Sequence, residues 1–194
     1  MAEHEITPDI WLITHRFVTE KNVRPALGNI PVIDRARLFE VEGEAPSWLA
    51  WYEVRKPVDV FDSMGWTDNA LELEGMAFDL CRDISNACHR YDEARWLYVV
   101  HTDVPDEVAA EYNDWYDREH LPRLARVPGV VRARRYVACD GHPRYFTAYD
   151  LADRDAFTSP QGLEARKTPW TERMRNLFSN TRRFTGRLIT DQNE

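Results

Sequence analysis

Val130-Val-Arg-Ala-Arg-Arg-Tyr136 is the stretch that decides the fold, because an earlier part of the chain repeats it. Ile33-Asp-Arg-Ala-Arg-Leu-Phe39 matches it position for position, at an offset of 97 (132 − 35). Tyr145-Phe-Thr-Ala-Tyr-Asp-Leu151 matches Trp48-Leu-Ala-Trp-Tyr-Glu-Val54 at the same offset (149 − 52). Self-similarity at a fixed offset indicates an internal duplication. We therefore expect two units, residues 1–93 and residues 94–194.

Each unit predicts the same order of elements. Residues 11–18 and 96–102 both begin with Trp-Leu and are rich in β-branched and aromatic residues, which is typical of strands. Residues 58–85 carry a mixed helical pattern whose register is not fixed, with Gly75 in the middle. The order strand, helix, strand, strand, helix, strand predicts a ferredoxin-like antiparallel sheet with both helices on one face.

The paired strands are apolar on both faces, as Trp48-Leu-Ala-Trp-Tyr52 and Tyr145-Phe-Thr-Ala-Tyr149 show. Helices explain the burial of one face, and the sheet of the sister unit is the simplest cover for the other. The predicted fold class is therefore α+β, with two tandem ferredoxin-like repeats forming one barrel within the chain.

The first helix of the second unit carries an unusual face. In Glu111-Tyr-Asn-Asp-Trp-Tyr-Asp-Arg-Glu-His-Leu-Pro-Arg-Leu124, the helical period gathers three aromatic rings, a carboxylate and an imidazole on one side. These five residues are Tyr112, Trp115, Tyr116, Glu119 and His120. The offset between the units grows from 85 (96 − 11) to 97 across this helix, so the second unit holds twelve extra residues here. We expect a functional second unit and a scaffolding first unit.

Pro122 disfavours a helical conformation for Leu121 and predicts a helix end or kink after His120. His120 would then lie near the negative end of a helix dipole and titrate near neutral pH, which suits proton transfer. The alternative is a helix whose aromatic residues belong to the core and whose histidine is a C-terminal cap.

Asn113-Asp-Trp-Tyr-Asp-Arg-Glu-His-Leu-Pro-Arg-Leu-Ala-Arg-Val-Pro-Gly-Val130, followed by Arg132-Ala-Arg-Arg-Tyr136, resembles the EthD-like and related families of the dimeric α/β-barrel superfamily. The resemblance covers residues 96–190, and residues 10–92 look like a degenerate member that lacks the motif. It implies two ferredoxin-like units paired into a barrel, with ligand cavities beside the helices or inside the barrel, and His120 as the motif histidine. Members act as cofactor-free isomerases, cyclases, lyases or monooxygenases on small cyclic or aromatic metabolites.

The expected catalytic residues are His120 as general acid or base, Glu119 or Asp117 to orient its ring, and the Tyr116 hydroxyl as electrophile. The expected substrate-binding residues are Tyr112, Trp115, Tyr98, His101 and Arg134. Arg132 and Arg134 could hold a carboxylate or an enolate. Because Arg35 and Arg37 repeat this pair in the first unit, ion pairs across the barrel are the favoured alternative. The basic run from Arg166 to Arg187 is interpreted as a solvated face.

Composition limits the partners. A formal charge of −8 over 194 residues disfavours nucleic acid, and no apolar run is long enough to cross a membrane. The N-terminus lacks the features of a signal peptide, and three cysteines at no metal spacing indicate free thiols in the cytoplasm. We expect no metal and no cofactor, since the motifs of nucleotide sites are absent. A homodimer through helix faces is compatible with the pattern.

The leading hypothesis is a cofactor-independent enzyme of the isomerase, cyclase or lyase type that moves a proton on a small cyclic or aromatic carbonyl compound. One alternative is a binding protein that holds a hydrophobic metabolite without turnover. Another is a haem-dependent barrel enzyme with His120 as axial ligand, since related barrels hold haem in that way.

Overall fold

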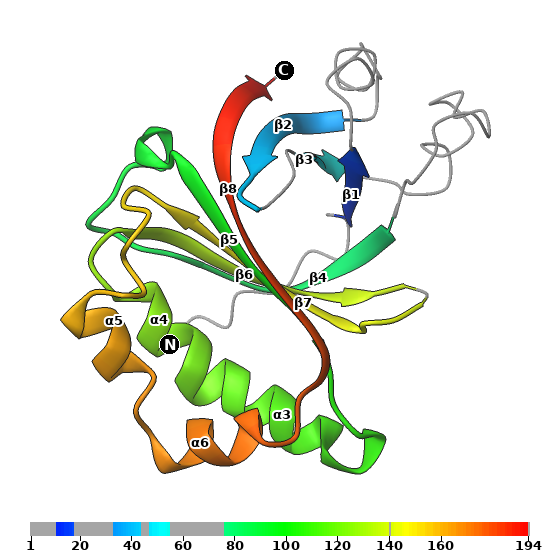
Figure 1. The fold of residues 1–194 in the computed structure, drawn as a ribbon, viewed down its shortest axis with the longest axis vertical. Coiled ribbons are helices and arrows are strands. Elements are labelled where there is room, and N and C mark those ends of the chain that lie inside the picture. Colours follow the sequence, from blue (N-terminus) through cyan, green and yellow to red (C-terminus); the bar gives the residue numbers. More distant parts are fainter. Residues whose placement is uncertain (1–10, 18–32, 44–46, 55–75, 140, 194) are drawn as a thin grey trace.

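A closed barrel of eight strands forms the centre of the structure, a computed structural model that describes residues 11–17, 33–43, 47–54, 76–139 and 141–193 (Figure 1). Around the barrel the strands follow the order β1-β3-β2-β8-β5-β7-β6-β4. The strands are β1 (Trp11–Phe17), β2 (Ile33–Val41), β3 (Ser47–Val54), β4 (Met76–Ser85), β5 (Trp96–Asp103), β6 (Val130–Ala138), β7 (Tyr145–Leu151) and β8 (Ser179–Asn193).

The barrel consists of two runs with the same topology. In the run β4-β1-β3-β2 and in the run β8-β5-β7-β6, the fourth strand of a unit lies beside its first, then come the third and the second. Every neighbouring pair is antiparallel. The pairs β2·β8 and β4·β6 join the runs, for example at Phe39↔Leu188 and Leu80↔Tyr136. The prediction of a ferredoxin-like α+β barrel within one chain is confirmed.

Most of the predicted strands agree closely with the structure. The bounds of β2 and β7 are those expected from the repeat. Residues 76–85, however, belong to a strand and not to the helical pattern assigned to residues 58–85. Strand β4 hydrogen-bonds to β1 and β6, and this pairing overrides the local spacing of its apolar residues. The predicted short helix of the first unit lies outside the described residues.

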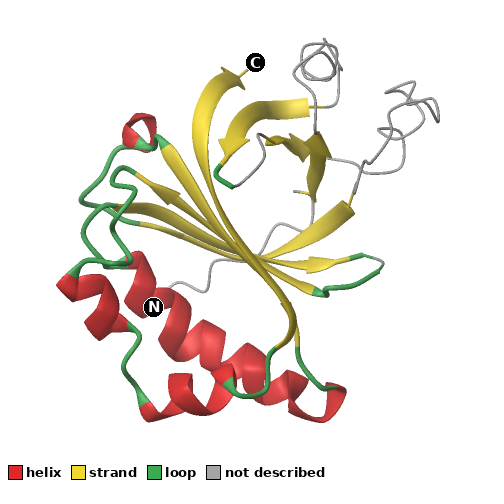
Figure 2. Ribbon diagram, viewed as in Figure 1, coloured by secondary structure: helices red, strands yellow, loops and turns green. Residues whose placement is uncertain are grey.

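The described α-helices all cover one side of the second run of strands, as Figures 1 and 2 show. They are α3 (Ala109–Trp115), α4 (Leu121–Ala125), α5 (Pro160–Ala165) and α6 (Pro169–Arg175), with a π-helical turn over Tyr116–His120 between α3 and α4. Ser159 and Thr168 accept hydrogen bonds from the first turns of α5 and α6, so both helices begin at side-chain caps. No described helix has both the length and the apolar character needed to cross a membrane.

Two apolar cores lie on the two faces of the second run. The outer core lies under the helices and contains Trp115, Leu121, Tyr149 and Met174. The inner core lies inside the barrel and contains residues of both units, among them Trp51 and Phe146. In the second unit the two-sided apolar strand is therefore covered by helices outside and by the sister strands inside, as the sequence predicted.

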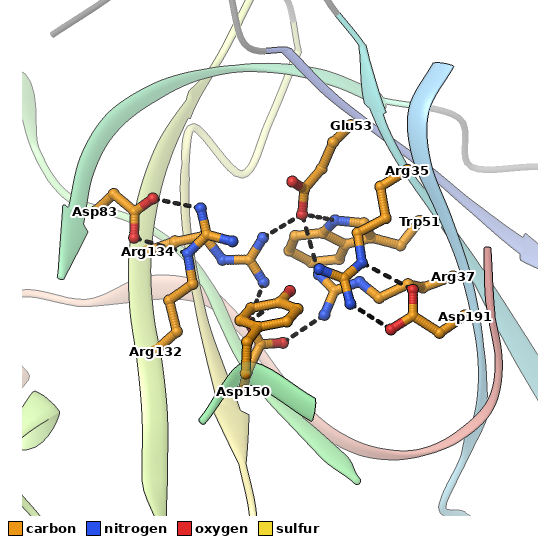
Figure 3. A network of polar contacts seen from close by, with 10 residues as sticks. Arg35, Arg37, Trp51, Glu53, Asp83, Arg132, Arg134, Asp150 and Asp191 are labelled. Carbon is orange, nitrogen blue, oxygen red and sulfur yellow. Dashed lines mark hydrogen bonds and ion pairs between the residues drawn. The ribbon is translucent and has the colours of Figure 1, made fainter. Parts of the chain in front are cut away.

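Buried ion pairs connect the two units inside the barrel (Figure 3). Arg37 contacts Asp150 (2.7 Å) and Glu53 (3.3 Å), and Arg134 contacts Glu53 (2.6 Å) and Asp150 (2.5 Å). Trp51 donates from Nε1 to Glu53, and both guanidiniums lie within 5 Å of its ring centre. We call Arg37, Glu53, Arg134 and Asp150 the central network. The predicted ion pairs across the barrel are thus present.

Charge pairing governs the ionisation of the central network. Burial alone would raise the pKa of Asp150, but Arg134 and Arg37 outweigh it and lower that pKa to about 2. Burial likewise opposes ionisation of Glu53, and Arg134, Arg37 and Arg132 lower its pKa to about 2. The network is therefore fully ionised at neutral pH, with charges that compensate one another.

Replacing Asp150 by asparagine is expected to lower the free energy of unfolding by about 3–5 kcal/mol, because Arg37 and Arg134 stay charged and lose a shared counter-ion. Urea denaturation followed by tryptophan fluorescence measures the change. Arg154→Gln is the control, since it removes exposed ion pairs with Glu42 and Asp155 and should leave the midpoint almost unchanged. An Asp150→Asn protein as stable as the wild type would contradict a stabilising role of the network.

Acid should weaken the same interaction. Both carboxyls have ordinary pKa values near 4 and folded values of about 2, so their contribution is complete above pH of about 4.5 and is lost as pH falls toward 2. The stability difference between wild type and Asp150→Asn should therefore shrink between pH 5 and pH 2. Denaturation curves at a series of pH values test this, and a difference that stays constant would refute it.

Candidate functional site

The helix that carries His120 does not end there, contrary to the sequence prediction. Tyr116–His120 forms a π-helical turn and α4 continues to Ala125. Pro122 has no N–H to donate, and the turn before it widens, so that Leu121 N–H bonds to Tyr116 O. The expected kink is thus replaced by a π turn, and His120 lies inside a continuous helical segment.

The imidazole of His120 is packed between aromatic rings. It stacks on Trp115, with ring centres 4.1 Å apart and an angle of 26° between the planes. Tyr116 meets it edge-on, with a centre distance of 5.1 Å. The ring is 8% exposed, and its Nδ1 atom is buried without a hydrogen-bond partner among the described residues.

His120 does not titrate near neutral pH, and that prediction is wrong. Burial lowers its pKa, and Arg175, Arg166 and Arg123 lower it further, to about 3. The expected stabilisation by a helix C-terminus is missing because the helix continues past the residue. At neutral pH the site therefore holds an uncharged imidazole in a positive field.

A cavity of about 50 Å³ lies beside His120, between the helices and the outer face of the second run. Six aromatic residues make up half of its lining: Tyr98, Trp115, Tyr116, Tyr149, Phe157 and Phe178. The rest of the lining is Val100, His120, Leu124, Arg166, Arg175 and Arg183. The volume is small beside the ~300 Å³ or more of a typical ligand pocket. A ring-containing ligand therefore requires side chains at the mouth to move.

Four of the expected site residues line this cavity together: His120, Tyr116, Trp115 and Tyr98. Tyr112 instead packs behind them, with its ring centre 4.6 Å from that of Tyr145. It is fully buried and belongs to the core, which the alternative interpretation of this helix predicted for the aromatic face.

The acidic residues expected to orient His120 have other partners. Glu119 accepts a hydrogen bond from Thr168, the cap of α6 (2.5 Å). Asp117 lies 3.8 Å from Arg135. Within the described part of the chain no hydrogen bond joins either carboxylate to His120, so stacking on Trp115 holds the imidazole.

His101 and Arg134 lie on the opposite face of the sheet from His120. His101 meets Phe78 and Phe146 of the inner core, and its Nε2 is 2.6 Å from Pro143 O. Arg134 is fully buried in the central network. The alternation of side chains along a strand explains both positions. Val100, next to His101, lines the cavity, and Arg135, next to Arg134, packs against rings of the helical segment. The structure does not bring either residue to the cavity.

Sequence analysis missed the cavity residues that come from the last third of the chain. Tyr149 lies opposite Tyr98 in the β5·β7 pair, and Arg183 lies opposite Val100 in the β5·β8 pair. Arg166 and Arg175 follow from the ends of α5 and α6. The alternation along β7 was a usable signal for Tyr149, whereas the arginines were hidden in a basic run interpreted as a solvated face.

Two larger hollows lie elsewhere on the described surface. One, of about 590 Å³, lies between α4 and α5 beside Arg126 and Gln161. The other, of about 610 Å³, lies beside Arg90, Tyr91 and Leu188 at the edge of the barrel. Both are open grooves. The cavity at His120 is smaller, but it is the most enclosed of these three and contains the buried imidazole of His120.

Comparison with solved structures shows which proteins share this fold. An anthrone oxidase-like protein matches with a TM-score of 0.71 and 11% identity over 96% of this chain and 94% of its own. A ferredoxin-fold protein related to antibiotic biosynthesis monooxygenases, from Listeria monocytogenes, matches with a TM-score of 0.64 and 11% identity over 95% and 96%. A haem-degrading enzyme from Listeria monocytogenes matches with a TM-score of 0.61 and 10% identity over 91% and 98%.

The chain shares a ferredoxin-like α+β fold with these solved structures. No family model matches the sequence, and no curated protein matches it either. At 10–11% identity these similarities establish the fold alone.

Haem does not fit beside His120. A macrocycle needs a slot far larger than the cavity of about 50 Å³, and Trp115 covers one face of the imidazole at 4.1 Å. An axial histidine requires one ring nitrogen directed into open space and usually a partner for the other. Here Nδ1 is buried and without a partner among the described residues. We derive no chemistry through haem at this position.

Arg175→Gln is expected to raise the pKa of His120 above about 3, because it removes the positive charge that, after burial, contributes most to lowering that pKa. Side-chain NMR of ¹⁵N-labelled histidine measures the titration, and a His120→Gln spectrum assigns the signal. Arg173→Gln is the matched control on the same helix, since Arg173 pairs with Glu111 and does not line the cavity. Equal titration curves in wild type and Arg175→Gln would contradict the electrostatic account.

Proposed function

We propose that this chain is a cofactor-independent enzyme that moves a proton on a small cyclic or aromatic carbonyl compound in the cavity beside His120. The observation that carries the proposal is an uncharged, desolvated imidazole that lines an aromatic cavity together with a phenol and three guanidiniums. Such a combination supplies a base, a hydrogen-bond donor and a positive field in one enclosed space.

In the proposed step, His120 removes a proton from the carbon next to the carbonyl group. The C–H bond breaks, an N–H bond forms on the imidazole, and the electron pair moves through the new C=C bond onto the carbonyl oxygen. The enolate is then reprotonated or reacts further. Tyr116 is the proposed donor to the oxygen, since both Tyr116 and His120 line the cavity. Glu119 is not given a catalytic role, because its carboxylate is bound to Thr168.

The low pKa of His120 is compatible with this step, because the proton transfer produces two charged groups, the imidazolium and the enolate. The arginines disfavour the imidazolium, since they lower the pKa of His120. The same positive charges favour the negative oxygen that forms at the same moment. The positive field therefore destabilises the protonated imidazole and stabilises the enolate oxygen, and the two effects offset each other.

The proposed division of labour follows the two units. Residues 94–194 carry the cavity side chains, and residues 1–93 complete the barrel. We further propose a cytoplasmic protein, supported by the free thiols of Cys81, Cys88 and Cys139, with a hydrophobic or aromatic small molecule as its partner.

The alternative function is binding without turnover. The small cavity and the very weak basicity of the free imidazole favour it, because a base with a pKa of about 3 has little driving force for proton transfer. A binding protein would hold the same ligands with an affinity that does not depend on His120 acting as a base.

Exchange of protons for deuterium next to a carbonyl group tests the proposal without knowledge of the product. Cyclic ketones of one to three rings that carry a C–H bond next to the carbonyl group are incubated with the protein in D₂O and followed by proton NMR. His120→Gln is expected to lower the exchange rate by roughly 10²–10⁴-fold. His142→Gln is the control, because that histidine is exposed and outside the cavity lining. Binding without exchange above the buffer rate would favour the binding protein.

The pH dependence of the same reaction reports the base. Because the free His120 has a pKa of about 3, kcat/KM should stay level on acidification from pH 8 to pH 5 and fall only below that range. A histidine that titrated near neutral pH, as the sequence predicted, would instead lose its activity as a base within this range. Tyr116→Phe should lower kcat with little change in affinity if the hydroxyl is the electrophile.

A further inference from the structure

We infer that the substrate of the cavity beside His120 carries a carboxylate, which is held by Arg175 and Arg183 at the mouth with Arg166 behind them. The inference rests on the proposed function for the location of the site, and it adds the charge class of the ligand. It concerns three residues that sequence analysis interpreted as part of a solvated surface.

The three arginines reach the cavity from separate elements. Arg166 is the residue that follows α5, Arg175 ends α6, and Arg183 lies in β8. All three line the same cavity as His120. Their convergence therefore results from the tertiary fold and not from one stretch of basic sequence.

Several other cations of the same part of the chain have an acidic partner among the described residues, and these three arginines do not. Arg173 pairs with Glu111 (2.5 Å), Lys167 with Glu164 (3.4 Å) and Arg187 with Glu40 (2.6 Å). Among the described residues no carboxylate forms an ion pair with the three cavity arginines. A protein with a net charge of −8 has acidic side chains in excess, so the absence of an ion pair at these three residues does not come from a shortage of carboxylates.

Arg166 is held in place without being neutralised. Its guanidinium donates to Gly162 O (3.2 Å) and to Phe157 O, and both acceptors are backbone carbonyls. Burial lowers its pKa, and repulsion by Arg175 lowers it further. Positive charge thus accumulates at a partly buried place, where an anion would relieve the repulsion.

A carboxylate satisfies these conditions better than a neutral group. Its two oxygens accept parallel hydrogen bonds from a guanidinium, and the bonds are strengthened by charge. One negative charge leaves the cluster of three cations positive, so the field that favours an enolate oxygen is retained. The aromatic wall formed by Trp115, Tyr149 and Phe178 provides the surface for a ring that bears the carboxylate.

Access requires a local rearrangement. The cavity of about 50 Å³ has room for a few water molecules and not for a six-membered ring. Arg175 and Arg183 are exposed and Phe178 is half-buried, so these side chains can move without unfolding the core. The guanidiniums repel one another in the free protein, since, after burial, Arg175 and Arg183 both lower the pKa of Arg166, and a bound carboxylate would offset this repulsion.

Benzoate and benzamide are the probes, because they have nearly the same shape and differ in charge. Isothermal titration calorimetry with the wild-type protein should give a lower Kd for benzoate than for benzamide. Arg175→Gln and Arg183→Gln should each weaken benzoate binding by roughly 10–100-fold and leave benzamide unaffected. Arg173→Gln is the control and should bind benzoate like the wild type. Circular dichroism melting curves verify that each variant is folded.

Binding should also be visible at His120. A carboxylate beside the arginines offsets their charge, so saturating benzoate should raise the pKa of His120, and benzamide should not. Equal affinity for the two probes, no binding of benzoate at millimolar concentration, or the same loss in Arg173→Gln as in Arg175→Gln would overturn the inference.

The outcomes separate this inference from the proposed function. If benzoate binds as expected but no ketone exchanges its protons, only the catalytic proposal fails. If exchange depends on His120 but benzoate and benzamide bind alike, only the carboxylate assignment fails.

Discussion

The buried pairing of Arg37 and Arg134 with Glu53 and Asp150 is the constraint on which the rest of the structure depends. Each guanidinium contacts both carboxylates, so every member of the network has partners in both units. Charges that are buried this deeply are tolerated only when all of them are paired. The two units must therefore close on each other, and the barrel is the arrangement that lets them do so.

The network also decides where a functional site can lie. Trp51, which corresponds to Ala148 in the second unit, and the paired charges occupy the inside of the barrel at this level, as Figure 3 shows. The outer face of the second run is covered by helices instead, and there the structure leaves a cavity. Neighbouring residues illustrate the division: Arg134 belongs to the network, whereas Arg135 lies under α3 against the rings of Tyr112 and Tyr116. The inner face of this sheet thus carries the central network, and its outer face carries the cavity beside His120.

The electrostatic character of the cavity follows from the same separation. Two acidic residues near the helices bind partners outside the cavity. Glu111 pairs with Arg173, and Glu119 accepts a hydrogen bond from Thr168. No described carboxylate forms an ion pair with Arg166, Arg175 or Arg183. An imidazole placed in that environment loses its proton readily, because both burial and positive charge oppose its cationic form. The arrangement resembles that of an oxyanion site, in which fixed positive groups precede the negative charge that they stabilise.

The sequence by itself determined the fold. The repeat at an offset of 97 and the strands that are apolar on both faces required two similar sheets in contact, and the duplicated Arg-x-Arg pattern indicated ion pairs across the barrel. These are properties of local spacing, which survives in the sequence because strand and helix periods are short. Four of the residues predicted for the site, Tyr98, Trp115, Tyr116 and His120, line one cavity in the structure.

Only the tertiary structure decided the chemistry of the site. The π turn before Pro122 depends on how a missing donor is accommodated within a packed helix. The low pKa of His120 depends on burial depth and on arginines 46 and 55 positions away (166 − 120 and 175 − 120). Spacing patterns encode which side of an element a residue faces and not how deeply it is covered or which distant charges approach it. Desolvation and long-range Coulomb interactions arise only in the folded molecule. They explain why His120 is uncharged at neutral pH, although the sequence predicted that it would titrate there.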